Sequence, residues 1–176
     1  IKITRNDNRS TTNTLNSLTV DGTSVEGFSG SKTYYDLGST EATSITIAAE
    51  RTDSKSSITG TGTKTLAYGT NTFKVVVTAE NTETKTYTIV IKKTDTRDTD
   101  SSLSNLSIEG LDIKFDSKEL YYYAVVKNSV TSVNIVATPA KTTSTVTGAG
   151  TKNLNVYENT FDIVVTAQNQ TKTTYS

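Results

Sequence analysis

The sequence predicts an all-β protein made of two tandem antiparallel β-sandwiches, and three observations support this prediction. Threonine makes up 37 of the 176 residues, and this β-branched residue suits a pleated, half-exposed strand surface. Apolar and polar residues alternate with a period of two, without a helical period. The third observation is an internal repeat, because a shift of 88 residues superposes the apolar positions, as when Phe73 falls on Phe161.

The strands of each copy follow from this alternation and from the turn residues between the apolar segments. Gly60-Thr61-Gly62 predicts a turn between two short strands, and 71–80 is the strongest strand segment. Seven short strands in each copy indicate a two-layer sandwich. In the first copy we expect strands at 15–21, 33–37, 44–50, 56–59, 64–67, 71–80 and 85–93.

The repeat also predicts the domain boundaries. Residues 14–93 are expected to form the first sandwich, 94–102 a polar linker, and 103–176 the second sandwich. The offset places Ile1 and Ile3 on Ile89 and Ile91 of the first copy. We therefore expect 1–13 to be the closing strand of a preceding repeat plus its linker, and the second sandwich to lack its own last strand.

The order of the apolar positions resembles a known family. The first copy runs through L-x-x-L-x-V, Y-x-L, I-x-I-x-A, N-T-F-x-V-x-V-T-A and Y-x-I-x-I, and the second copy repeats most of these positions, with Gly69 before the fourth motif replaced by Tyr157. This pattern resembles the bacterial cadherin-like β-sandwich repeat. The resemblance implies two sandwiches of immunoglobulin or cadherin type in a large secreted or wall-attached bacterial protein, where such repeats often serve as spacers beside catalytic or adhesive modules.

Composition excludes several classes of function. The chain contains no His and no Cys, and no Ser or carboxylate lies in a nucleophile-elbow signature, so we expect no enzyme. The 18 basic and 18 acidic residues form no basic patch for nucleic acid, and no apolar run predicts membrane insertion. Richness in Thr, Ser, Asn and Lys without Cys is typical of Gram-positive surface proteins. We expect an extracellular location at the cell surface or wall.

The linker offers a candidate metal site. Asp95, Asp98 and Asp100 could present oxygen ligands to calcium, the only cofactor that the sequence suggests. Arg97 lies inside this cluster, and no calcium-loop motif surrounds it. The alternative interpretation is a solvated polar linker.

Tyrosines offer a candidate interaction surface. Strand alternation predicts that Tyr35 and Tyr123 are buried and that Tyr34 and Tyr122 are exposed. An exposed tyrosine can stack on a sugar or pack against a host protein, so the chain is alternatively an adhesin or a carbohydrate-binding module. The other interpretation is that these are ordinary sandwich positions.

Ile1 and Ile3 suggest an assembly device. They have the alternation of the closing strand that the second sandwich lacks, so Ile1–Arg5 of one molecule could complete the second sandwich of the next. The expected function is a non-catalytic structural repeat, acting as a spacer, stalk or fibre subunit. Its expected partners are neighbouring repeats or copies of itself, with a glycan or host protein as the alternative.

Overall fold

The computed structural model describes all 176 residues and consists of strands joined by turns, as the sequence predicted. The chain divides into two compact units, Ile1–Thr96 and Arg97–Ser176. The first unit contains β1 (Leu15–Val20), β2 (Thr23–Ser24), β3 (Tyr34–Thr40), β4 (Ser44–Arg51), β5 (Ser57–Thr59), β6 (Gly62–Thr65), β7 (Gly69–Thr78) and β8 (Thr84–Lys93). The second contains β9 (Leu103–Ile108), β10 (Ser132–Pro139), β11 (Thr145–Thr147), β12 (Gly150–Asn153), β13 (Ile163–Thr166) and β14 (Lys172–Tyr175).

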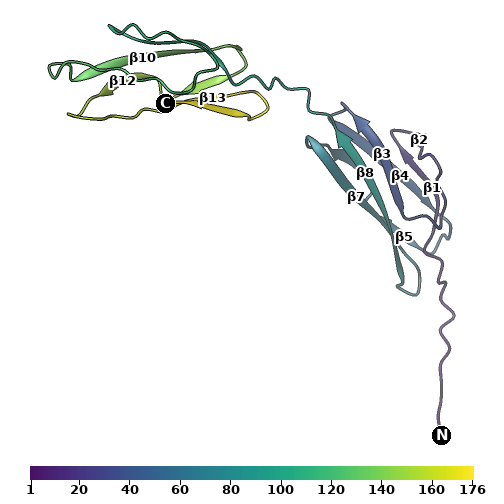
Figure 1. Cartoon of the computed structure of the whole chain (residues 1–176). Helices are drawn as coiled ribbons and strands as arrows, with labels where there is room; N and C mark the ends of the chain where they lie inside the picture. The colour runs from purple at the N-terminus through teal and green to yellow at the C-terminus, as the bar shows by residue number, and fades with distance from the viewer. The chain divides into compact units, whose positions relative to one another are not determined.

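The first unit is a sandwich of two four-stranded sheets, with strand orders β2-β1-β4-β6 and β3-β8-β7-β5 (Figure 1). Side chains alternate along each strand, so the apolar set of each sheet faces the other sheet. The core is formed by Leu15, Leu18, Val25, Tyr35, Ile45, Ile47, Leu66, Val75, Val77, Tyr87, Ile89 and Ile91. All strand pairs are antiparallel except one, because β3 runs parallel to β8.

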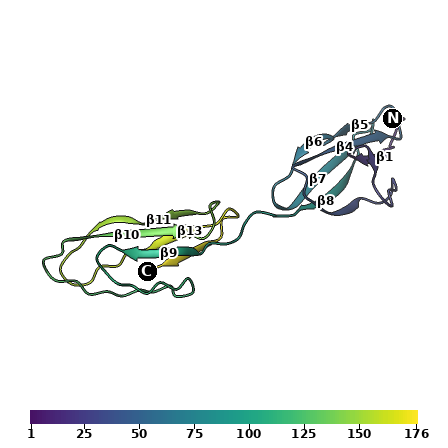
Figure 2. The same ribbon diagram turned by 90° about the horizontal axis from the view of Figure 1, so that it is seen from above.

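The second unit has two three-stranded sheets, with orders β12-β10-β9 and β11-β13-β14, whose strands run along the length of that unit in Figure 2. Its core repeats that of the first unit on a smaller scale and comprises Leu103, Leu106, Ile135, Ile163, Val165 and Tyr175. The expected seven strands per copy become eight in the first unit and six in the second. The second unit lacks counterparts of two strands, β2 and β3, and the segment that corresponds to β3 is discussed below.

A glycine turn shows how closely the two units repeat each other. Gly60 lies between β5 and β6 with φ +90°, and Gly148 occupies the same place with φ +89°. A Cβ atom added to either glycine would lie 2.0 Å from a backbone carbonyl oxygen, that of Lys74 or that of Asp162. Any larger residue would therefore push the turn away from the neighbouring strand.

Candidate functional site

The closing strand of the first unit defines what a complete sandwich looks like. β8 lies between β3, which is parallel to it, and β7, which is antiparallel to it. Ile89 of β8 faces Tyr35 on one side and Phe73 on the other. Ile89 and Ile91 are buried in the core, and Lys93 ends the strand with its Nζ donating to the Leu66 carbonyl at 3.3 Å.

In the second unit, Ser176 makes backbone hydrogen bonds that correspond to the start of the pairing between β8 and β3. The Ser176 amide donates to the Leu120 carbonyl at 2.8 Å, and the Tyr122 amide donates to the Ser176 carbonyl at 2.8 Å. The first of these bonds corresponds to the one from Thr88 to Thr33 at 2.7 Å in the first unit, where β8 then continues to Lys93. Ser176 is the counterpart of Thr88, so the 176 residues include no counterpart of Ile89–Lys93.

The two segments that would flank such a strand are open. Residues 120–126, the counterpart of β3, and 156–161, the counterpart of the start of β7, form no strand. We call these two segments together the open edge. Its exposed large apolar side chains are Tyr121, Tyr123, Val125, Val156 and Tyr157. These five residues lie on two segments outside the sheets and leave apolar surface exposed on the second unit.

Tyr157 adds backbone strain to the open edge. Its φ is +84°, close to the +87° of the equivalent Gly69. A bulky residue rarely adopts this left-handed conformation, which costs about 1–3 kcal/mol. The second unit thus keeps the turn geometry although tyrosine replaces glycine. The Tyr157 side chain is 96% exposed.

The expectation for Tyr122 and Tyr123 was wrong. Tyr122 packs partly against the core and stacks on Phe115, with ring centroids 6.2 Å apart, whereas Tyr123 is 87% exposed. Tyr35 makes the same contacts in the first unit, stacking on Phe28, with an offset of 87 rather than 88 residues. From Phe115 to the tyrosines, the second copy is therefore displaced by one residue relative to the 88-residue offset. A displacement of one residue exchanges the two faces of a strand. Tyr34 is 54% exposed, as the alternation predicted.

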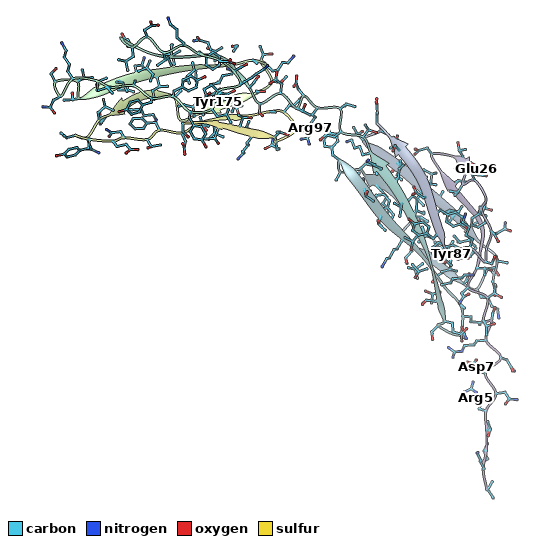
Figure 3. The ribbon with its side chains drawn as sticks, in the orientation of Figure 1. Arg5, Asp7, Glu26, Tyr87, Arg97 and Tyr175 are labelled. Atoms are coloured by element: carbon cyan, nitrogen blue, oxygen red, sulfur yellow. The ribbon has the colours of Figure 1, made fainter.

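The N-terminal segment projects from the first unit. Ile1 and Ile3 are exposed and 1–14 form no strand; Figure 3 shows Arg5 and Asp7 on this extended segment. Within the segment, the Asp7 carboxylate accepts from Arg9 Nε at 2.9 Å and Nη2 at 2.7 Å. These hydrogen bonds from Arg9 lower the pKa of Asp7 to about 2.

The segment that leads into each unit is hydrogen-bonded to the hairpin loop between the last two strands of that unit. The Ser10 amide donates to Glu80 Oε2 at 3.0 Å, and the Asn81 amide donates to the Ser10 carbonyl at 3.1 Å. The hydrogen bond from the Ser10 amide, followed by that from Lys55, lowers the pKa of Glu80. In the second unit the Asp98 amide donates to Gln168 Oε1 at 3.1 Å, and the Asn169 amide to the Asp98 carbonyl at 3.1 Å.

The linker aspartates that suggested calcium take part in local turns. Asp98 Oδ1 accepts from the Asp100 amide at 2.8 Å, and Asp100 Oδ1 accepts from the Ser102 amide at 2.9 Å and its hydroxyl at 2.6 Å. These bonds from Ser102 lower the pKa of Asp100. No group of three or more acidic residues in the structure could hold a metal ion. The calcium site at Asp95, Asp98 and Asp100 stays a prediction.

The resolved pKa shifts of the carboxyl groups all have the same direction. Every carboxyl group whose pKa clearly departs from its ordinary value has a lowered pKa, namely Asp7, Asp53, Glu80 and Asp100. A general acid at neutral pH needs the opposite shift, produced by burial or by a second acid.

The fold consists of two all-β sandwich units, and the family match of the second unit suggests a domain of the structural or adhesion type. The family model of the cadherin-like beta sandwich domain matches residues 103–176. The resemblance seen in the sequence is thereby confirmed for the second unit, and the 88-residue repeat relates the first unit to it. Domains of this type are generally non-catalytic and typically extracellular.

Two further findings complete the comparison. A search of curated proteins found no match to the chain. None of the elements of the fold is a helix long and apolar enough to cross a membrane.

Proposed function

We propose that the chain is a structural repeat of an extracellular bacterial surface protein, where it acts as a spacer, stalk or fibre subunit. The single observation that carries this proposal is the repeated construction of two sandwiches in one chain, which share the glycine turns at Gly60 and Gly148. The family match of the second unit and the cysteine-free, threonine-rich composition support it. Repeated modules of this kind set distance and stiffness rather than chemistry.

We further propose that copies join head to tail, with Ile1–Arg5 of one copy completing the open edge of another. The 88-residue offset places Ile1, Ile3 and Arg5 on Ile89, Ile91 and Lys93, which form the closing strand of the first unit. The added strand would run parallel to 120–126 and antiparallel to 156–161, as β8 does between β3 and β7. Strand addition of this kind satisfies backbone groups at a sheet edge on both sides.

The expected affinity is modest. Burying two isoleucine side chains contributes about 3–6 kcal/mol in total, whereas association costs at least about 4 kcal/mol in lost freedom of motion. Two new backbone ladders add further stabilisation of about 0.5–1.5 kcal/mol per hydrogen bond. We therefore expect a Kd on the order of 1 μM or weaker, and an association that depends on concentration.

Sedimentation velocity of the 176-residue chain over a range of concentrations tests the joining step. The sedimentation coefficient should rise with concentration for the complete chain. It should stay that of a monomer when residues 1–5 are deleted. A chain carrying a second copy of Ile89–Lys93 after Ser176 should also stay monomeric, because its own strand fills the open edge. Association that survives the deletion, or a complete chain that is monomeric throughout, would reject strand donation.

One observation favours a second function, that of an adhesin or carbohydrate-binding module. Tyr121, Tyr123 and Tyr157 are exposed on the open edge of the same unit, and exposed aromatic rings stack on sugars. A screen of the complete chain against a panel of glycans separates the two functions. Saturable binding that is lost in Tyr123→Ala would favour recognition of a glycan over the spacer role.

A further inference from the structure

The edge strand β6 of the first unit presents unpaired backbone groups along one side. It pairs with β4 on the other side, and the Leu66 amide continues that ladder by donating to the Thr43 carbonyl at 2.8 Å. Hydrogen-bonded pairs alternate along an antiparallel ladder, so Lys64 also bonds to β4, whereas Thr63 and Thr65 direct their amides and carbonyls to the free edge. A free edge of this kind is a template for pairing with another strand.

The other edges of the first unit are short or irregular. β2 has two residues, β5 has three, and β3 shifts its register with β8 between Asp36 and Ser39. Very short edge strands and bulges both discourage edge-to-edge pairing of sheets. β6 has four residues with the Leu66 amide beyond them, and its register with β4 is unbroken. Its edge therefore needs a different protection.

Lys64 of β6 points toward the core of the sandwich. It stands directly opposite Ile45, which is buried, and directly opposed residues lie on the same face of a sheet. The Lys64 side chain is half-buried. Every buried side-chain nitrogen or oxygen has a hydrogen-bond partner, and the Lys64 ammonium has none. The alkyl stem therefore covers apolar surface while the ammonium reaches water past the free edge.

The second unit repeats this arrangement on β12. Lys152 stands opposite Val133, which packs against the core, and its Nζ lies 5.9 Å from the centre of the Phe161 ring. The Leu154 amide donates to the Thr131 carbonyl at 2.8 Å, so the ladder has the same register as in the first unit. The free edge and its inward lysine thus recur together with an offset of 88 residues.

We propose that Lys64 and Lys152 prevent copies of this fold from joining sheet to sheet through the edges of β6 and β12. The partner that fits such an edge is the same edge of another copy, because two identical antiparallel edges can pair about a twofold axis. An added strand would cover the path by which the lysine ammonium reaches water, and a buried unpaired charge is strongly unfavourable. Inward-pointing charges protect edge strands in this way.

This protection matters most in a protein built from repeats. Neighbouring units of one fold meet at high local concentration, and misassembly between them is a characteristic failure of repeat proteins. The inference is independent of strand donation, which uses neither β6 nor β12. Lateral pairing would instead extend the sheets β2-β1-β4-β6 and β12-β10-β9.

Sedimentation velocity of the 176-residue chain tests the proposal. Lys64→Met with Lys152→Met keeps the unbranched apolar stems and removes both charges. This double variant should associate at a concentration at least about tenfold lower than the unaltered chain, because no ammonium has to leave water. Lys64→Arg with Lys152→Arg retains both charges and should match the unaltered chain. Lys74→Met, which removes an exposed charge from the inner strand β7, should match it too.

Hydrogen exchange identifies the surface that associates. In the associated methionine variant, the edge amides of Thr63, Thr65, Thr151 and Asn153 should exchange more slowly, because they gain acceptors on the partner strand. Association through strand donation would be common to all variants and leaves the comparison intact. A methionine variant that sediments like the unaltered chain overturns the proposal, as does association without slower exchange at these amides. Equal association of the arginine variant, or loss of the fold in the methionine variant, would also overturn it.

Discussion

The hydroxyl of Tyr87 accepts a hydrogen bond from the buried Leu15 amide at 3.1 Å, which links the last strand of the first unit to its first strand across the two sheets. The same hydroxyl donates to the Gly30 carbonyl at 2.7 Å. Tyr175 and Leu103 repeat the first contact at 3.1 Å in the second unit, and Figure 3 shows both tyrosines among the strands of their units.

Replacing Tyr87 with Phe should destabilise the first unit by about 1–3 kcal/mol, because the buried Leu15 amide is left without its acceptor. The Gly30 carbonyl keeps a donor in Lys85 Nζ at 2.6 Å. Hydrogen exchange resolved by residue should show faster exchange throughout the first unit and unchanged exchange in the second. Tyr175→Phe should reverse the pattern, and equal effects of the two substitutions on both units would contradict this account.

The glycine turn offers a matched pair of substitutions. Gly60→Ala should destabilise the first unit by at least about 2 kcal/mol, because the new methyl group meets the Lys74 carbonyl in addition to the strain of φ +90°. Gly62→Ala has a similar φ of +95° but no atom within 4 Å of its Cβ, so it should cost only about 1 kcal/mol. Thermal unfolding of both variants measures the difference, and equal losses would show that steric contact is not the cause.

Exchanging Tyr157 and Gly69 tests the strain in the open edge. Tyr157→Gly should stabilise the second unit by about 1 kcal/mol, because the exposed ring makes little contact while glycine tolerates φ +84°. Gly69→Tyr should destabilise the first unit by a similar amount. Chemical denaturation followed separately for each unit by NMR provides the measurement. A loss of stability in Tyr157→Gly would mean that the ring makes contacts which offset the strain.

The hydrogen bond between the Ser10 amide and the Glu80 carboxylate should weaken in acid. Hydrogen bonds lower the pKa of Glu80 in the folded chain, so its contribution is complete above its ordinary value of 4.5 and is lost as the pH falls through the lower folded value. Amide exchange at Ser10 should therefore speed up below pH 4.5, beyond the intrinsic change with pH. Gln168 replaces Glu80 in the second unit, so exchange at Asp98 should lack this transition. Identical profiles at the two amides would contradict this cause.

Alternation and the internal repeat predicted the sandwich and most of its core, because residues such as Leu18, Ile47 and Val77 are buried wherever a strand presents one face inward. The same rule failed at Tyr122 and Tyr123, since a one-residue shift in a loop moves every following side chain to the opposite face. The sequence also could not predict the parallel pairing of β3 with β8, because the alternation of side chains is the same in either strand direction.

The candidate site was predicted in part. The offset that places Ile1 and Ile3 on Ile89 and Ile91 predicts a donor strand, and strand donation stays a proposal. The neighbours of an outward residue could not be predicted, because they depend on strand order and register. The sequence analysis also did not use one difference between the copies, which is that Glu158 and Asp162 stand where the first copy has Thr70 and Lys74.

Disulfide trapping between two chains tests strand donation most directly, since the chain contains no cysteine of its own. Lys2→Cys in one chain and Thr160→Cys in another would place the two Cα atoms directly opposite at about 4.5–5.5 Å, within the range of a disulfide. We predict that the mixed chains form a disulfide dimer under mild oxidation. Lys2→Cys with Glu158→Cys, a diagonal pair at about 7–8 Å, should form it far more slowly. Equal trapping of the two pairs, or none of either, would contradict the assembly proposed for this protein.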